Sequence, residues 1–272
     1  MWGGKLDTVR ALYLAGKSAE ATDIRNSLFR EKHPKSYSVT EQKVINLLQK
    51  SSYVEFTELL ESIDEDITES IIFESRIKSI ASIFESQNSL RGDEATIETI
   101  RDLLGFRYWI KCERFSDFPE MMVSLITQIL SKVGTKYELK YIRLFDSSDH
   151  PYQMASLHFK VDEILAEVII MNLMFQSAFS RTLYPMWEGH TKERFDTTDI
   201  PFPFKEGEID YLWGVVCHAL INESAILPFP NYSCACEGHC IFRKQFQEID
   251  LEDIRTRVER ISTEYGGGFV FE

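Results

Sequence analysis

The chain has 272 residues, of which 44% are hydrophobic and 12% aromatic, and its formal net charge at pH 7 is −13. This length and hydrophobic fraction suffice for a sizeable core in one large domain with appendages. General nucleic-acid-binding proteins are more often basic, so the negative charge argues against sequence-independent binding to a duplex.

No targeting or membrane segment is apparent. Met1–Lys17 lacks the continuous apolar core of a secretory signal, and the apolar runs Ile164–Met174 and Trp213–Ile221 are too short to span a bilayer. The five cysteines are an odd number, and Cys112 and Cys217 lie in apolar stretches, which is typical of reduced, buried thiols. We expect a soluble cytoplasmic protein with no membrane partner.

The first fifty residues are predicted to be helical and carry an excess of positive charge. Helices are expected over 5–33, with a break near Gly16, and from a capping start at Ser38–Glu41 to about Lys50. The basic residues of this segment are Lys5, Arg10, Lys17, Arg25, Arg30, Lys32, Lys35, Lys43 and Lys50. A solvated helical face is favoured over a binding face for such residues.

The remaining elements follow from hydrophobic periodicity. Helices are predicted over Phe56–Ile71, 94–104 (ended by Gly105), Phe118–Lys132, Asn172–Trp187, Tyr211–Ile221 and Leu251–Tyr265 (ended by Gly266–Gly268). Strands are predicted over Gly105–Cys112, Tyr137–Leu144, Ala155–Val161 and Ile164–Ile170, with irregular segments at Asp146–Pro151, 194–208 and Pro228–Cys240. Helices and strands that alternate in this way indicate an α/β or α+β domain, a mixed sheet flanked by helices.

The stretch Glu74–Lys111 contains the first candidate site residues. Arg76 and Lys78 are two residues apart, so on an extended segment both would point to one side and could contact successive phosphates. Ser82, one helical turn further on, could add a hydroxyl. The alternative is that these are ordinary surface cations.

Two acidic residues are candidates for a metal site. Asp102 lies off the apolar face of its helix and just before a strand, where sites in α/β proteins are usually built. Glu167 is the lone acid of an apolar strand, and burying it is unfavourable unless it binds a cation. Two such carboxylates on adjacent strands could hold Mg²⁺. The alternative, that Glu167 faces solvent or pairs with Arg107, is equally open.

Taken together, the motifs resemble a known family. The segments SRIKSIASI (75–83) and IRDLLGFRYWI (100–110) are followed by Ser156-Leu157-His158, by the strand with Glu167 and by WEGHTK (187–192). In this order they resemble the synthetase domain of RelA/SpoT-type alarmone enzymes, including small and toxin-type members. The resemblance implies a nucleotidyltransferase-like α/β domain over 56–193, with an N-terminal helical segment (1–55) and a C-terminal extension (194–272).

The activity implied by the resemblance is Mg²⁺-dependent transfer of pyrophosphate from ATP to the 3′-hydroxyl of a purine nucleotide. Some toxin-type members modify the 3′ end of tRNA instead, and the basic N-terminal segment is then where its contacts are expected. A homo-oligomer is compatible with the resemblance. The alternative is a catalytically degenerate nucleotide-binding or regulatory module of the same fold.

The resemblance also implies a role for each matched residue. Positioning, a metal and positive charge are what phosphoryl transfer requires. The implied phosphate ligands are Arg76, Lys78, Ser82 and Arg107. The implied Mg²⁺ ligands are Asp102 and Glu167, and Glu167 would also activate the 3′-hydroxyl. Tyr152 would stack on the acceptor base and His158 would face the acceptor.

The chain departs from the family pattern at three places. Ser86 stands where the family has a lysine, and Met154 stands where it has the stacking tyrosine, with Tyr152 two residues early. Ile169–Asn172 replaces a segment that contains a polar residue and an arginine. These departures favour a diverged member with changed substrates, or one without activity.

A second cluster lies outside the resemblance. Cys234, Cys236, His239 and Cys240 gather soft ligands that could bind Zn²⁺. Their spacing is not that of a standard zinc finger, so a loop of reduced thiols is favoured over a zinc site.

Overall fold

The computed structural model describes residues 18–66, 71–83, 97, 100, 102–112, 117–144, 154–173 and 250–271. Several predicted features lie outside these residues. They are the turn at Asp146–Pro151, Tyr152, Ser86, the helices predicted after Asn172 and over Tyr211–Ile221, the loop 194–208 and the Cys-rich segment that ends at Cys240.

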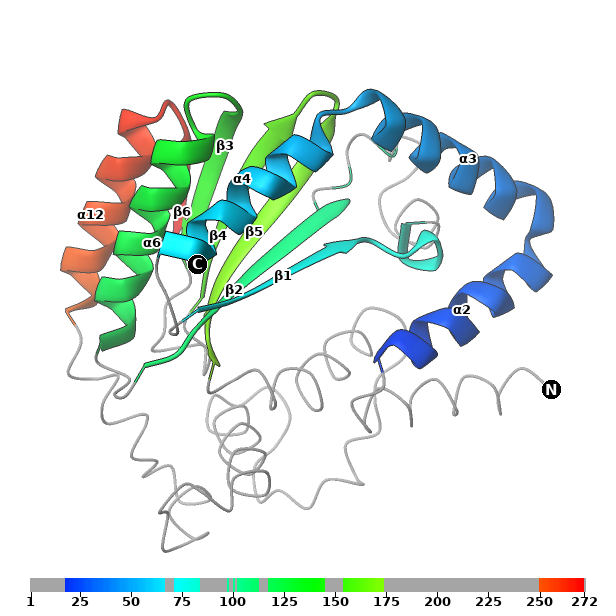
Figure 1. The fold of residues 1–272 in the computed structure, drawn as a ribbon, viewed down its shortest axis with the longest axis horizontal. Helices are drawn as coiled ribbons and strands as arrows, with labels where there is room; N and C mark the ends of the chain where they lie inside the picture. Colours follow the sequence, from blue (N-terminus) through cyan, green and yellow to red (C-terminus); the bar gives the residue numbers. More distant parts are fainter. Residues whose placement is uncertain are drawn as a thin grey trace, which may run out of the picture.

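The described residues form a mixed sheet and the helices around it (Figure 1). The helices are α2 (Ser18–Lys32), α3 (Pro34–Lys50), α4 (Tyr53–Asp66), α6 (Phe118–Val133) and α12 (Leu251–Glu264). The strands are β1 (Ile71–Ile77), β2 (Leu104–Ile110), β3 (Glu138–Leu144), β4 (Met154–Val161), β5 (Ile164–Asn172) and β6 (Gly268–Phe271). The predicted class, a mixed α/β sheet flanked by helices, is confirmed.

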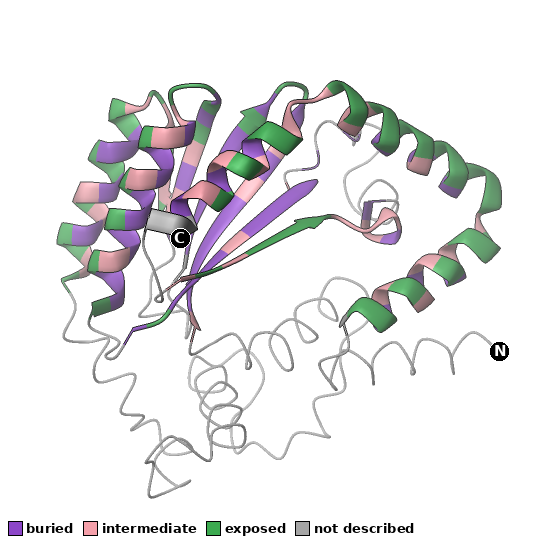
Figure 2. Ribbon diagram, in the orientation of Figure 1, coloured by how far each residue is buried: buried purple, intermediate pink, exposed green. Residues whose placement is uncertain are grey.

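The six strands are ordered β1-β2-β5-β4-β3-β6. The pairs β2–β5 and β3–β6 are parallel, whereas β1–β2, β5–β4 and β4–β3 are antiparallel. Helices α4, α6 and α12 lie against one face of this sheet, while α3 and α2 lead away from it beyond the edge strand β1 (Figure 1). β1 is largely exposed, whereas its neighbour β2 and the next strand, β5, are largely buried (Figure 2).

The core lies between the sheet and these three helices. Phe56 of α4 is fully buried, and its ring centroid lies 5.4 Å from that of Phe106, 5.0 Å from that of Tyr137 and 5.6 Å from that of Phe159. The Tyr108 hydroxyl donates a hydrogen bond of 2.7 Å to a backbone carbonyl of α4. Phe106 and Tyr108 therefore face the helices, and by strand alternation Arg107 and Trp109 face the opposite side of the sheet. The strand was predicted from this alternation of residues in the sequence 105–112.

Element boundaries differ from prediction near the N-terminus. The capping start at Ser38 is wrong, because α3 begins four residues earlier at Pro34, after His33, whose side chain makes no capping bond. Proline is favoured in the first turn of a helix because its missing N–H would have no partner there. Ile71 was assigned to a helix but opens β1, since α4 ends at Asp66.

Three strands also differ from the predicted boundaries. Gly105 does not end a helix but lies within β2. β5 continues to Asn172, where a helix was expected to begin. Gly266, with φ of 73°, follows the end of α12 as predicted, but Gly268 opens the unpredicted strand β6. Four residues are too few for alternation to reveal a strand.

Two further predictions concern the thiol of Cys112 and the apolar character of the helices. Cys112 is buried, as predicted, and burial raises the pKa of its thiol to about 12. Among the helices of the described ranges, none combines the length and the apolar character needed to cross a bilayer.

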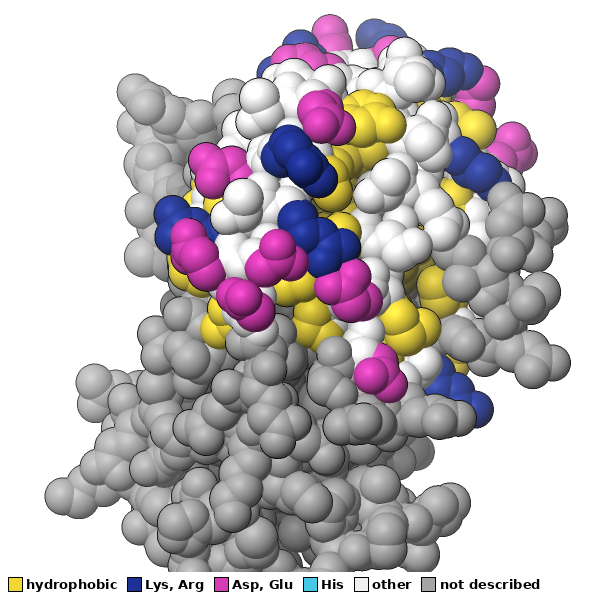
Figure 3. Space-filling view, turned by 90° about the vertical axis from the view of Figure 1, so that its left-hand side faces the viewer, with side chains coloured by type: hydrophobic (Ala, Val, Ile, Leu, Met, Phe, Trp, Pro, Cys, Tyr) yellow, Lys and Arg dark blue, Asp and Glu magenta, His cyan; other side chains and the backbone are white. Residues whose placement is uncertain are grey.

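The surface around α12 is of mixed charge. Arg257 pairs with Glu120 of α6 at 2.6 Å and with Asp253 at 3.3 Å, and Arg255 pairs with Glu252 at 3.4 Å. Figure 3 shows acidic and basic side chains interspersed on this side of the molecule. Exposed pairs of this kind contribute little to stability individually.

The aromatic cluster around Phe56 gives a stability prediction. Phe56→Ala leaves a cavity between α4 and the sheet, and the free energy of unfolding should fall by about 3–5 kcal/mol. Val54→Ala, at a position of the same helix that is 52% exposed, should change it by less than about 0.5 kcal/mol. Urea unfolding followed by circular dichroism measures both. Equal effects of the two substitutions would contradict this packing.

Candidate functional site

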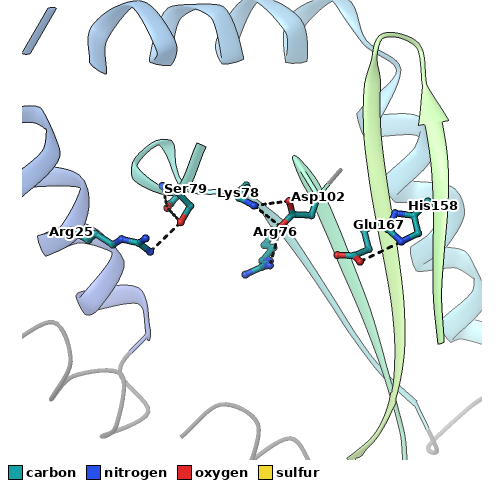
Figure 4. A network of polar contacts seen from close by, with 8 residues as sticks. Arg25, Arg76, Lys78, Ser79, Asp102, His158 and Glu167 are labelled. Carbon is teal, nitrogen blue, oxygen red and sulfur yellow. Dashed lines mark hydrogen bonds and ion pairs between the residues drawn. The ribbon is translucent and has the colours of Figure 1, made fainter. Parts of the chain in front are cut away.

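A row of polar side chains crosses the sheet on the face away from α4, α6 and α12. The register pairs Arg76 with Gly105, Gly105 with Glu167, Glu167 with His158 and His158 with Tyr141. Residues paired in this way lie directly opposite one another on a single face. The row therefore brings together the predicted residues Arg76, Glu167 and His158, whose side chains are drawn in Figure 4.

The absence of a side chain at Gly105 lets the Arg76 side chain lie over the backbone of β2. A Cβ atom at position 105 would lie 3.0 Å from Nε and 3.2 Å from Cγ of Arg76. Any larger residue would thus displace the arginine. The glycine has a packing role in this row, and the guanidinium of Arg76 reaches from β1 toward the acidic residues next to it.

Asp102 lies in the turn before β2 and is paired with Lys78, the residue directly after β1. Lys78 Nζ is 2.6 Å from Oδ1 and 2.8 Å from Oδ2 of Asp102, and Arg76 Nη2 is 3.9 Å from Oδ2 (Figure 4). The backbone N–H of Lys78 also donates to the Leu103 carbonyl at 2.9 Å. Arg76 and Lys78 therefore both lie next to Asp102, to which the sequence analysis assigned a separate role.

Glu167 is an acid in a largely buried position, with a side chain that is 18% exposed. Burial, and to a smaller extent the negative charge of Asp102, raises the pKa of its carboxyl from 4.5 to about 7, although the positive charges of Arg76, Arg143 and Lys78 act in the opposite direction. The carboxylate of Asp102 therefore lies close enough to raise the pKa of Glu167. The alternative in which Glu167 faces open solvent does not fit this position.

His158 is buried next to Glu167 and is fixed from three sides. Its Nε2 lies 3.0 Å from the Ser156 hydroxyl and 3.5 Å from Oε1 of Glu167. Its ring stacks on Tyr141, with centroids 4.2 Å apart, and the Arg143 guanidinium lies 6.0 Å from the centre of the Tyr141 ring.

Sequence reasoning missed Ser156, Tyr141 and Arg143 as members of this site. Ser156 could have been found, since it is two residues from His158 on the same strand. Tyr141 and Arg143 could not be placed reliably, because β3 shifts register between Leu139 and Tyr141. Such an irregularity changes which residues face the site.

The other predicted residues are placed as follows. Arg107 lies on the same face as Glu167, one row further along β2. Ser82 lies in the segment that follows β1, and its hydroxyl accepts a hydrogen bond of 3.1 Å from Arg25 of α2. Arg25 is a contact that the sequence did not suggest. Tyr152 and the residues Cys234, Cys236, His239 and Cys240 lie outside the described residues.

The departures on β5 make part of the face apolar. Ile169 and Met171 follow Glu167 on the same side of the strand and are 9% and 0% exposed. Beyond Glu167, this strand can therefore offer no polar side chain from those two positions.

Asp102 and Glu167 can be tested as ligands for the implied Mg²⁺. Within the described ranges, no group of three or more His, Cys, Asp or Glu side chains gathers as a metal cluster would require. Mg²⁺ needs fewer protein ligands, because it retains waters and takes phosphate oxygens. Two neighbouring carboxylates, one of them with a pKa raised partly by the other, fit such a cation.

No protein-family model and no curated protein matches the chain. Among solved structures it is similar to the small alarmone synthetase 1 from Bacillus subtilis, with 17% identity over 70% of this chain and 90% of that chain and a TM-score of 0.38. The structure of that enzyme bound to AMPCPP has 13% identity over 71% of this chain and 93% of that chain, with a TM-score of 0.35. The structure of the same enzyme bound to its product pppGpp has 16% identity over 84% of this chain and 97% of that chain, with a TM-score of 0.32.

The position of Glu167 predicts a pH-dependent stability. Because its pKa in the folded state (about 7) lies above 4.5, the folded protein binds this proton more tightly than the unfolded chain. The wild type should therefore lose stability as pH rises from about 4.5 through about 7, by on the order of 3 kcal/mol relative to Glu167→Gln. Urea unfolding in EDTA near pH 5 and near pH 8 measures the difference.

The exposed Glu163→Gln is the control for this experiment, because Glu163 lies in the turn between β4 and β5. Its stability difference from the wild type should not vary over the same pH range. If the difference in unfolding free energy between the wild type and Glu167→Gln were equally independent of pH, Glu167 would titrate as a solvent-exposed acid.

Proposed function

We propose that the protein transfers the pyrophosphoryl group of ATP to the 3′-hydroxyl of a purine nucleotide or, as a second acceptor class, of a tRNA end. The observation that carries this proposal is the cluster at Glu167, where Asp102, in the turn before β2, pairs with Arg76 and Lys78 and lies close enough to Glu167 to raise its pKa. Two carboxylates beside two cations are what binding of a metal and a polyphosphate requires. The resemblance of the motifs to the RelA/SpoT-type family supports the same reaction.

In the proposed reaction, the 3′-oxygen of the acceptor bonds to the β-phosphorus of ATP. The bond from that phosphorus to the α,β-bridging oxygen breaks, and AMP leaves. Arg76 and Lys78 would bind the donor phosphates, with support from Ser82 and Arg107. Asp102 and Glu167 would hold Mg²⁺, which when bound neutralises phosphate charge.

Glu167 is suited to receive the proton of the 3′-hydroxyl. Its pKa of about 7 lies near physiological pH, which is the range in which a carboxylate accepts and releases a proton most effectively. His158 lies within 3.5 Å of it and is fixed by Ser156 and by the Tyr141 ring. On this basis His158 would orient the acceptor next to the base.

One contact favours the second candidate function, a nucleotide-binding module without turnover. The ammonium of Lys78 contacts both carboxylate oxygens of Asp102 and neutralises it without a metal. For transfer to occur, the donor phosphates must draw Lys78 away from Asp102. If they do not, nucleotide could bind to the cations while Asp102 remains closed to Mg²⁺.

Transfer can be measured with ATP labelled in the γ-phosphate, Mg²⁺ and, in turn, GDP, GTP, ADP and bulk tRNA. Asp102→Ala and Glu167→Ala should each lower the rate about 100-fold or more, because each removes charge that acts on the transferred group. Glu163→Ala, at an exposed acid beside β5, should leave it unchanged. Transfer that survives both site substitutions would refute the assignment. Absence of transfer with nucleotide binding retained would favour the module without turnover.

A further inference from the structure

Helix α2 contacts the segment that follows β1 through two neighbouring side chains. Arg25 Nη1 donates to the Ser82 hydroxyl at 3.1 Å, and the Asn26 side-chain carbonyl accepts from the backbone N–H of Ala81 at 3.1 Å. These partners are 57 and 55 residues apart in the chain. Arg25 is only 7% exposed, so its guanidinium is buried against this segment and does not belong to the solvated face of the helix.

The segment that Arg25 contacts is held in a compact shape by its own hydroxyls. Ser79 Oγ lies 3.0 Å from Ser82 Oγ and accepts from the Ser82 backbone N–H at 3.2 Å. Lys78 directly precedes Ser79. Figure 4 shows the guanidinium of Arg25 directed at this segment, while the ammonium of Lys78 is directed at Asp102. The segment that carries the predicted phosphate ligand Ser82 is thus contacted by Arg25 and directly preceded by Lys78.

The type of side chain matters at this position. An arginine has five N–H donors in a rigid planar fork, and one bond to a hydroxyl can fix the plane while another edge contacts an oxyanion. Asn26 fixes the backbone on which that hydroxyl stands, so the relative position of the guanidinium and Ser82 is determined by two independent bonds.

We propose that Arg25 is a ligand of the donor phosphates, so that α2 is part of the nucleotide site. This inference rests on the proposed function. Arg25, Lys78 and Arg76 then supply three positive charges to a triphosphate, the first from a helix, the second from the segment after β1 and the third from β1 itself. The affinity that Arg25 contributes should depend on how many phosphates the nucleotide carries.

The experiment compares the dissociation constants of AMPCPP and AMP, measured by calorimetry with Mg²⁺ on the full chain. Arg25→Gln removes the charge and leaves a shorter amide side chain, and Arg25→Lys keeps the charge. Arg25→Gln should weaken AMPCPP about 10-fold or more, since hydrogen bonds to charged groups contribute about 1.5–3 kcal/mol, and should change AMP less than about 3-fold. Arg25→Lys should retain more AMPCPP affinity than Arg25→Gln.

Arg30→Gln is the matched control, because Arg30 is on the same helix, is exposed and pairs with Glu41 at 3.1 Å. It should leave both constants unchanged. Equal weakening of AMPCPP and AMP by Arg25→Gln, or no weakening, would overturn the inference while leaving the proposed function intact. A wild-type protein that binds neither nucleotide would overturn both. Should the glutamine variant fail to fold, Arg25→Lys decides: a selective loss for AMPCPP supports the inference, and an unselective one refutes it.

Discussion

The carboxylate of Glu167 is largely buried in the interior of the sheet, and the arrangement of the site follows from this constraint. Burial of a charged group is unfavourable unless cations or hydrogen bonds compensate it. Arg76, Lys78 and Arg143 supply positive charge, and the pKa of the carboxyl is nevertheless raised to about 7. A shift of β5 by one residue would turn Glu167 into the apolar core and Val168 out of it, so the strand register and the site depend on each other.

Glu167 also divides the site into two halves of different chemistry. Arg76, Lys78 and Asp102 lie on the side of the edge strand β1. On this side, Arg25 of α2 also contacts Ser82, in the segment that follows β1. On the other side lie His158, the Tyr141 ring that stacks on it, and Arg143. The proposed donor phosphates would occupy the first half and the acceptor the second, with the proton-accepting carboxylate between them.

The sequence predicts those features that depend on local patterning. Alternation identified the outward face of β2, and the lone acid in β5 singled out Glu167. Features that depend on contacts between distant segments were missed. The pairing of Lys78 with Asp102 and of Arg25 with Ser82 leaves no periodic signal, because it joins elements that meet only in the folded sheet. The helical spacing before β1 continued as far as Ile71, although the helix itself ends at Asp66.

The most direct measurement is a crystal structure of the protein with AMPCPP and Mn²⁺, in which the anomalous signal of manganese locates the cation. We expect Mn²⁺ between the carboxylates of Asp102 and Glu167, with Lys78 moved from Asp102 to the phosphates and the triphosphate next to Arg76. A nucleotide bound elsewhere on the molecule, or manganese at a site that includes neither carboxylate, would contradict it.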